Sequence, residues 1–395
     1  MTDVHGEVAP GFEPVREAFQ ANFEQRGEVG AAFSLYKHGV KVVDVWGGVA
    51  DQDSGRSWEQ ETLQLVFSTT KGATAACASL LAQRGLLDFD APAAEYWPEF
   101  KAQGKENIPV RWLLSHRSGL PAVDVPLTPA ELYAWDPIVD ALAAQKPYWE
   151  PGTKHGYHAV TYGYLVGELV RRITGKSIGA FFKDEIADPL GAEFYIGLPA
   201  SEEPRVSKLI TMQLGMDDNQ REMFKNFDVE SLDPAVRDLV KAFLDPNSLS
   251  SRALNLSVPA MDFNDPAAHA AEVPAAAGIC TARGLARMYA GLIGEVDGVR
   301  ILDDATIANA IEEQSFGQDA ILMKETRFGL GFFLQSEFAP MIGPRSFGHD
   351  GAGGSMGFAD PDVGVAFGYV MNKMQVNLSA DPRPLSLVAA VKSCI

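Results

Sequence analysis

The most informative stretch of this chain is STTKGATAACASLLAQRG, residues 68–85. Its side chains are small and apolar on nearly every side, and it ends at a glycine. It therefore predicts a helix over 69–84, buried inside a protein core. Ser68 lies at the N-terminus of this helix, where free backbone N–H groups and the positive end of the helix dipole favour a developing negative charge. The stretch thus predicts a reactive serine at the start of a core helix.

Ser68 is followed one helical turn later by Lys71, and this spacing places both side chains on the same face. A serine hydroxyl is a poor nucleophile until a neighbouring base takes its proton, and Lys71 is the candidate base. To act as a base at neutral pH, the lysine needs its pKa lowered by about 3 units, through burial and nearby positive charge. A second Ser-x-x-Lys, Ser34 to Lys37, lies in a predicted hairpin over 31–46, where the two side chains point to opposite faces. We therefore assign the chemistry to the first copy.

The composition limits the class of protein and the kind of partner. The chain has 395 residues, enough for two subdomains around a large core. A formal net charge of -19 disfavours nucleic acid and anionic membrane surfaces as partners and favours a small molecule. No segment has the length of a membrane span, the N-terminus lacks the pattern of a secretion signal, and the three cysteines are widely spaced, without metal-like clustering. We expect a soluble cytoplasmic protein.

The order of the predicted elements indicates an α+β fold. Strand-like segments lie near both ends of the chain, and helical patterns dominate the middle. We expect an α/β sandwich, in which an antiparallel sheet is flanked by N- and C-terminal helices and carries an inserted, mostly helical subdomain. The sheet domain would comprise 1–86 and 271–395 and the helical domain 87–270, with the active site in the cleft between them. The expected helices are 12–26, 69–84, 129–144, 160–174, 232–244, 281–293 and 385–394, and the expected strands are the hairpin 31–46, 328–335, 345–350, 354–359 and 363–371.

Two further segments carry candidate site residues. Tyr157 follows a Pro-Gly turn and precedes an apolar helix, so its phenol is a candidate base or proton relay beside an ammonium group. A second run, FGHDGAGGS at 347–355, is a strand that leads into a glycine-rich stretch, where the backbone can approach a ligand closely. There the N–H of Ala352 would lie opposite the N–H of Ser68 and complete an oxyanion hole. A glycine-rich turn without a catalytic role is the alternative for this run.

A competing motif lies in the same run. Residues 353–357, GGSMG, match the Gly-x-Ser-x-Gly pentapeptide of the α/β-hydrolase nucleophile elbow, which would make Ser355 the nucleophile. That fold needs a helix directly after the serine, and then an acid and a histidine later in the chain. Here a predicted strand and hairpin follow instead, and none of the seven histidines lies after Ser355. We interpret the pentapeptide as a chance match.

The order of these motifs resembles that of the serine β-lactamase and penicillin-binding-protein superfamily, and most closely that of the class C β-lactamase-like family VIII carboxylesterases. The resemblance covers nearly the whole chain, and it includes LLSHRSGL at 113–120 and WEPGT at 149–153. It implies an acyl-enzyme mechanism that needs neither a metal nor an organic cofactor. The implied roles are acylated nucleophile for Ser68, proton transfer for Lys71 and Tyr157, and substrate binding with completion of the oxyanion hole for His349, Asp350, Gly351 and Ala352.

Two departures from the family pattern bear on the substrate. Tyr157 is followed by His-Ala, where class C β-lactamases typically have Tyr-x-Asn, so the amide that positions a β-lactam side chain is missing. His349 and Asp350 replace the frequent Lys-Thr, and a neutral histidine beside an anionic aspartate would hold a carboxylate poorly. We therefore predict a carboxylesterase that hydrolyses small, short-chain, neutral esters through an acyl-enzyme on Ser68.

Other activities of the same site remain alternatives. A β-lactamase, or a D-amino acid amidase or peptidase, would use the same residues on a different acyl donor. A non-catalytic sensor would be acylated on Ser68 without turnover. Aromatic side chains of the helical insertion would line the acyl or alcohol pocket, unless they only pack in the core; the candidates are Tyr133, Trp135, Tyr148 and Trp149.

Overall fold

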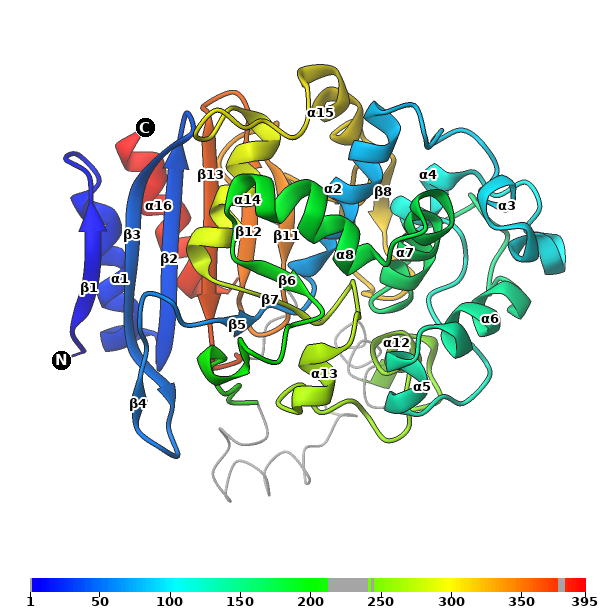
Figure 1. Ribbon diagram of the computed structural model, residues 1–395, viewed down its shortest axis with the longest axis horizontal. Helices are drawn as coiled ribbons and strands as arrows, with labels where there is room; N and C mark the ends of the chain where they lie inside the picture. The colour runs from blue at the N-terminus through cyan, green and yellow to red at the C-terminus, as the bar shows by residue number, and fades with distance from the viewer. Residues whose placement is uncertain (1, 212–240, 243–244, 376–380) are drawn as a thin grey trace.

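The computed structural model describes residues 2–211, 241–242, 245–375 and 381–395. Its main feature is a ten-stranded antiparallel sheet with the order β1-β3-β2-β13-β12-β11-β10-β9-β8, and β4 pairs with β3 off this path (Figure 1). Strands from both ends of the chain therefore share one sheet, as expected. The bounds are Val4–Val8 (β1), Gly30–Lys37 (β2), Val40–Asp51 (β3), Arg56–Ser57 (β4), Ser315–Gln318 (β8), Glu325–Phe328 (β9), Phe333–Leu334 (β10), Phe347–Asp350 (β11), Met356–Asp360 (β12) and Val365–Met371 (β13).

The centre of the sheet joins the N-terminal hairpin to the C-terminal strands. β2 pairs with β13, so that Phe33 lies opposite Tyr369. Every residue of β13 is buried, because helices cover both faces of the sheet. A small second sheet has the order β5-β7-β6, with bounds Gln64–Leu65, Gly278–Cys280 and Phe194–Ile196. The predicted hairpin 31–46 and the predicted strands 345–350, 354–359 and 363–371 are confirmed, with slightly different bounds.

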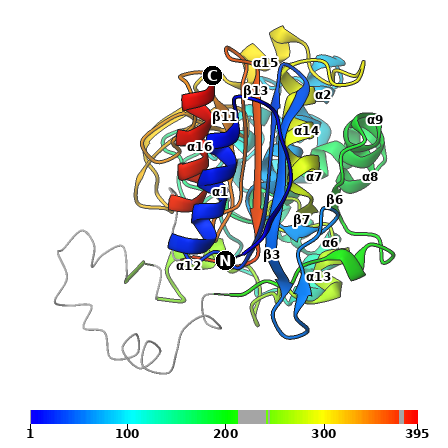
Figure 2. The ribbon, with the colours of Figure 1, turned by 90° about the vertical axis from the view of Figure 1, so that its left-hand side faces the viewer.

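Helices pack against both faces of the sheet (Figure 2). The helices α1 (Glu13–Gln25) and α16 (Pro382–Cys394) lie side by side on one face, and α14 (Ala282–Ile293) lies on the other. α14 approaches closely because Gly368 of β13 has no side chain. A Cβ atom there would lie 2.5 Å from the carbonyl oxygen of Ala282. This arrangement is the expected α/β sandwich.

The helix expected at 69–84 is α2, Thr70–Gln83. All of its residues up to Leu81 are buried, including Cys77. Its glycine, Gly72, lies against α14, where a Cβ atom would come within 2.1 Å of a tyrosine hydroxyl oxygen. The prediction of a core helix is confirmed, and close packing against α14 holds the first turn of α2 in place.

The helix expected at 129–144 is wrong as a single element. The structure divides it into α5 (Pro129–Tyr133) and α6 (Asp136–Ala144). The break lies at Trp135, whose φ of 68° cannot continue a right-handed helix. The Trp135 indole instead donates a hydrogen bond to Glu168 at 2.9 Å, so a contact made across the fold overrides the local pattern.

The strand expected at 328–335 is also wrong as a single element. β9 ends at Phe328 and β10 begins at Phe333, and the chain turns between them. Gly331 in this turn has a φ of 88°, and a Cβ atom there would lie 2.3 Å from the hydroxyl oxygen of Tyr162. The turn stacks the rings of Phe328 and Phe333 on each other, with centroids 4.5 Å apart.

The remaining helices complete the fold. The closing helix begins earlier than the expected 385, because Asp381 caps the N-terminus of α16 through the N–H of Arg383. The helix expected at 232–244 lies outside the described residues except for 241–242, and the division into two subdomains stays a prediction. The helices expected at 12–26, 160–174 and 281–293 are confirmed as α1, α7 and α14. The further bounds are Ala93–Tyr96 (α3), Val110–Leu114 (α4), Thr161–Thr174 (α7), Ile178–Phe182 (α8), Asp188–Leu190 (α9), Leu249–Leu254 (α12), Pro266–Ala270 (α13) and Asp304–Ala310 (α15).

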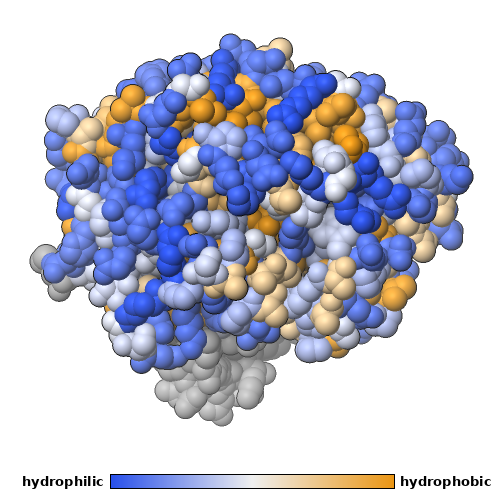
Figure 3. Space-filling model, in the orientation of Figure 1, coloured by the Kyte–Doolittle hydropathy of each residue, from blue (hydrophilic) through white to orange (hydrophobic). Residues whose placement is uncertain are grey.

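The face in Figure 3 is mostly hydrophilic, with small, scattered hydrophobic patches. In the part of the chain that the structure describes, no helix combines the length and the apolar character that crossing a membrane requires.

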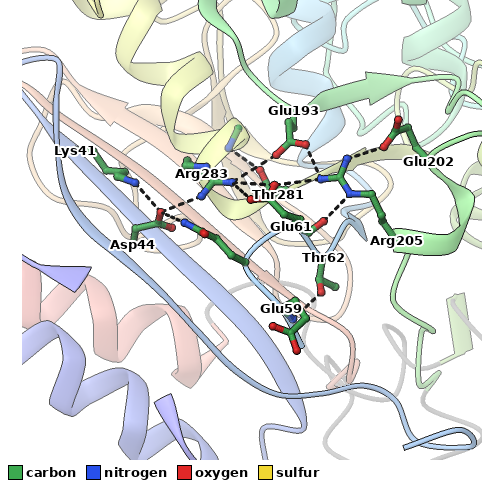
Figure 4. Close-up of polar contacts among 12 residues, drawn as sticks. Lys41, Asp44, Glu59, Glu61, Thr62, Glu193, Glu202, Arg205, Thr281 and Arg283 are labelled. Atoms are coloured by element: carbon green, nitrogen blue, oxygen red, sulfur yellow. Dashed lines mark hydrogen bonds and ion pairs between the residues drawn. The ribbon is translucent and has the colours of Figure 1, made fainter. Parts of the chain in front are cut away.

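A network of ion pairs ties the two sheets together at the surface (Figure 4). Arg283 of α14 lies 3.1 Å from Asp44 of β3 and 3.3 Å from Glu61, which precedes the small sheet. Arg205 lies 3.4 Å from Glu61 and also pairs with Glu193, next to β6. The network thus fixes the segment that leads through β5 to Ser68.

Candidate active site

Ser68 lies at the start of α2, directly after a residue with an unusual backbone. Phe67 has a φ of 45°, which costs energy for a residue with a side chain. The N–H of Val66, just before, donates to Gly278 of β7 at 2.9 Å, so the small sheet holds the turn in place. The N–H of Ser68 has no acceptor among the described residues. The turn therefore presents both the side chain and the N–H of Ser68 at the end of the helix.

Lys71 is fully buried, with its amine next to Ser68. Its Nζ lies 3.1 Å from Ser68 Oγ and donates to the carbonyl oxygens of Ala159 at 2.6 Å and Ala275 at 3.0 Å. Burial lowers the pKa of Lys71 well below its ordinary value, although the charge of Asp350 opposes this shift. A neutral amine has two N–H groups and one lone pair. Because the two carbonyls take both N–H groups, the lone pair is left for the Ser68 hydroxyl.

Tyr157 lies between Lys71 and His349. Lys71 Nζ lies 4.7 Å from the centre of its ring, and its hydroxyl lies 3.5 Å from His349 Nε2. Burial raises the pKa of Tyr157 well above its ordinary value. The shifts of Lys71 and Tyr157 both favour the uncharged form. Burial therefore favours a neutral amine beside a protonated phenol.

Asp319 holds the backbone of Tyr157 in place, and the sequence analysis missed it. Its Oδ1 accepts hydrogen bonds from the N–H groups of Tyr157 at 3.0 Å, Ile321 at 2.8 Å and Leu322 at 2.8 Å. Its Oδ2 accepts one from Thr326 at 3.2 Å. The only local signal is an aspartate at the start of the apolar run AILM, which is typical of an Asx turn.

His349 extends from β11 toward Tyr157 in a defined tautomer. Its Nδ1 lies 2.6 Å from the carbonyl oxygen of Asp350, which can only accept, so Nδ1 carries the proton. Burial lowers the pKa of His349 well below its ordinary value, so the ring is neutral. Its Nε2 is therefore an acceptor that points at the phenol of Tyr157.

The glycine-rich stretch after β11 brings Ala352 to the turn that carries Ser68. The N–H of Ala352 has no acceptor in the described part of the chain. Gly351 touches the turn directly, since a Cβ atom there would lie 2.2 Å from the carbonyl oxygen of Val66. Ser355 fastens the contact: its buried Oγ donates to Val66 O at 2.9 Å and lies 3.1 Å from Thr69 Oγ1. The strand β12 follows Ser355, which confirms that the pentapeptide is not a nucleophile elbow.

The four aromatic pocket candidates make contacts of several kinds. Trp135 is bonded to Glu168, as described above, and Tyr148 donates to Asp124. Trp149 is buried and its ring lies 6.1 Å from that of a histidine, whereas Tyr133 is only half-buried. Their role as a substrate pocket stays a prediction.

A small pocket lies beside His349. Its lining is mainly apolar, with two carboxylates, and sequence reasoning missed most of it, because the residues come from separate segments that only the fold brings together. The lining comprises Phe333, Ala339, Pro340, Met341, Gly348, His349, Asp350, Gly351, Gly354, Met356, Asp381, Pro384 and Leu385.

The sheet, the core helix and the Ser-x-x-Lys turn together define the β-lactamase/DD-peptidase-like fold, and comparisons with known proteins agree. A family model described as Beta-lactamase matches residues 15–392. The chain is 35% identical over 376 residues to the esterase/beta-lactamase LipL of Mycobacterium tuberculosis, covering 94% of this chain and 83% of LipL. The chain therefore belongs to the beta-lactamase family.

Two solved structures are similar over essentially the whole chain. One is a family VIII carboxylesterase, with 39% sequence identity, a TM-score of 0.85 and coverage of 100% of both chains. The other is EstA from Arthrobacter nitroguajacolicus Rue61a, with 34% identity, a TM-score of 0.84 and coverage of 99% of this chain and 98% of that one. The resemblance inferred from the motifs is confirmed.

Proposed function

We propose that this protein is a serine carboxylesterase that hydrolyses small neutral esters through an acyl-enzyme on Ser68. The observation that carries the proposal is the position of the Lys71 amine. It lies 3.1 Å from Ser68 Oγ, and two backbone carbonyls occupy its N–H groups. A buried amine held in this way is a base aimed at one hydroxyl.

In the acylation step, Ser68 Oγ attacks the ester carbonyl carbon while Lys71 takes the hydroxyl proton. The negative charge that develops on the carbonyl oxygen is stabilised by the N–H groups of Ser68 and Ala352. Tyr157 gives its phenolic proton to the leaving alkoxide and recovers a proton from the Lys71 ammonium. The products of this step are an alcohol and an acyl-enzyme, and the pair is neutral again.

In the deacylation step, a water molecule attacks the acyl carbon and the same pair accepts its proton. The C–O bond to Ser68 breaks, Ser68 Oγ regains a proton and the carboxylic acid leaves. His349 keeps the phenol of Tyr157 oriented throughout, because its Nε2 is the acceptor that faces it at 3.5 Å.

Neutral substrates fit the electrostatics of the site. Asp350 contributes a carboxylate to the pocket beside His349, whose lining is mainly apolar. An anionic substrate would meet like charge there. The solved structures named above include a carboxylesterase, in keeping with an ester substrate. The acidic composition and the widely spaced cysteines support a location in the cytoplasm.

A second activity, β-lactam hydrolysis, is favoured by one observation: the similar protein LipL is called both an esterase and a beta-lactamase. The test compares hydrolysis of a short-chain nitrophenyl ester, a chromogenic cephalosporin and a D-alanyl amide. We expect the ester to be hydrolysed far faster than the other two. Faster turnover of the cephalosporin would reverse the assignment, and a burst equal to the enzyme concentration with nothing after it would indicate a sensor.

The nucleophile is tested by labelling with a fluorophosphonate and mass spectrometry. We expect the label on Ser68 in the native protein and no label in Ser68→Ala. Ser355→Ala serves as the matched control and should still be labelled on Ser68. A label on Ser355 instead would refute the proposed site.

A further inference from the structure

Arg383 is a fully buried arginine at the start of α16, on the face of the sheet that also carries α1 (Figure 2). A guanidinium has five N–H groups, and each of them has an acceptor here. Nε donates to Asp381 Oδ1 at 3.0 Å and Nη2 donates to Asp381 Oδ2 at 2.8 Å. Nη1 donates to Glu28 Oε1 at 3.1 Å and to the carbonyl oxygen of Lys373 at 2.8 Å. The fifth bond runs from Nη2 to the carbonyl oxygen of Gly353 at 2.6 Å.

The bond to Gly353 connects this cluster to the oxyanion loop, by which we mean residues 351–354. Gly353 directly follows Ala352, the residue that offers its N–H to the substrate oxygen. The next residue, Gly354, has a φ of 127°, and a Cβ atom there would lie 2.6 Å from both Arg383 Nη2 and Asp381 Oδ2. The loop backbone therefore lies flat against the guanidinium, and only glycine permits this approach.

Stability alone is a weak reason for such a cluster. Removing a guanidinium and two carboxylates from water costs about as much as their mutual attraction returns, so a buried ion pair adds little net stability. The cluster does fix the positions of the bonded groups relative to one another, because the planar guanidinium holds its five partners in one arrangement. Those partners come from three separate regions: the segment before β2, the oxyanion loop and the segment that follows β13.

We propose that Arg383 is a positioning residue for catalysis: it holds the oxyanion loop from behind, so that the N–H of Ala352 lies at the distance the tetrahedral intermediate requires. Ser355 fastens the other side of the loop to the turn that carries Ser68. The two anchors set the separation of the two oxyanion donors. This inference rests on the proposed function, because it gives Ala352 the role of an oxyanion donor.

The test uses Arg383→Lys, which keeps the charge but offers fewer donors and no planar fork. Removal of one oxyanion donor lowers kcat by about 100- to 1000-fold, so a displaced donor should lower kcat by about tenfold or more. KM should stay within about twofold, because ground-state binding does not need this donor. Affinity for a trifluoromethyl ketone, whose adduct on serine carries the oxyanion, should fall by the same factor as kcat.

A second variant and a control separate positioning from folding. Asp381→Asn keeps the side-chain shape but weakens the bonds to the Arg383 guanidinium. It should give a smaller loss of kcat and of inhibitor affinity, and it can be measured even if Arg383→Lys does not fold. Ser386→Ala is the control. Its hydroxyl bonds to Asn22 and to the backbone of Arg383 in the same α1–α16 interface, without touching the loop. It should lower the melting temperature without changing kcat or inhibitor affinity.

The outcomes also distinguish this proposal from the proposed function. If the native protein is not labelled on Ser68 by a fluorophosphonate, the function itself is wrong. Suppose instead that Ser68 is labelled, and that Arg383→Lys and Asp381→Asn melt at lower temperature yet retain kcat and affinity for the trifluoromethyl ketone. Arg383 is then a structural residue, and the positioning proposal is refuted. A parallel loss of kcat and inhibitor affinity supports it.

Discussion

Replacement of Asp319 by alanine should destabilise the protein and impair catalysis together, because this buried carboxylate fixes the backbone of Tyr157. One oxygen accepts hydrogen bonds from three N–H groups, those of Tyr157, Ile321 and Leu322. The side chain is 1% exposed, so water does not reach these donors in its place. Asp319→Ala leaves all three donors without a partner.

The expected magnitude follows from these three donors. A buried donor left unsatisfied costs about 1–3 kcal/mol, so the three together cost at least about 3 kcal/mol. Water that enters the space left by the carboxylate bonds to some of these donors and reduces the cost. We therefore expect the free energy of unfolding to fall by about 4 kcal/mol. Asp319→Asn keeps an oxygen in the same place and exchanges a charged acceptor for a neutral one, so it should cost about 1 kcal/mol.

The assay combines urea denaturation with steady-state hydrolysis of a nitrophenyl ester at a temperature where both variants are folded. Asp319→Ala should lose kcat, since Tyr157 is no longer held opposite Lys71 and His349, whereas Asp319→Asn should retain most of it. Equal losses of stability in the two variants would refute the hydrogen-bond argument. Full activity in folded Asp319→Ala would refute the link to Tyr157.

Three further predictions concern protonation and the oxyanion loop. Since burial lowers the pKa of Lys71, the acid limb of the kcat/KM profile should lie well below the ordinary lysine value of 10.5, and a limb near 10.5 would contradict the neutral amine. Burial also lowers the pKa of Lys105 to about 8. The folded state therefore binds fewer protons than the unfolded state between that value and 10.5, and this group makes stability rise with pH across the window. Lys105→Met should remove that rise, measured by urea denaturation at several pH values. Gly351→Ala would bring a Cβ atom within 2.2 Å of the Val66 carbonyl oxygen, so it should push the oxyanion loop away and lower kcat by about 100-fold with KM little changed. An alanine variant with normal kcat would show that the loop tolerates the shift.

The sequence predicted those parts of the fold that local patterns determine. The core helix α2 is small and apolar on nearly every side, and the C-terminal strands are bounded by glycine and proline turns, so their positions follow from nearby residues. The breaks at Trp135 and Gly331 depend on partners far along the chain, namely Glu168 and Tyr162. A local pattern contains no information about such contacts.

The same distinction applies to the site. Ser68 and Lys71 are one helical turn apart, so their contact at 3.1 Å could be predicted from spacing alone. The approach of Tyr157 to His349 could be expected only through the family resemblance. Arg383 could not be found, because an arginine that will become buried has no distinctive neighbours in the sequence, and the only signal for Asp319 is its place before the apolar run AILM.

The protonation states connect the mechanism to the choice of substrate. Burial lowers the pKa of Lys71 well below its ordinary value, which favours the neutral base, and burial also keeps His349 neutral. On β11 the neutral ring of His349 is followed by the carboxylate of Asp350. That carboxylate opposes the lowering of the Lys71 pKa, and an anionic substrate would add a second charge of the same sign. It would then favour the ammonium form and remove the base that Ser68 needs. A neutral ester leaves the base free, so the chemistry of the Lys71 amine and the preference for uncharged substrates have one electrostatic cause.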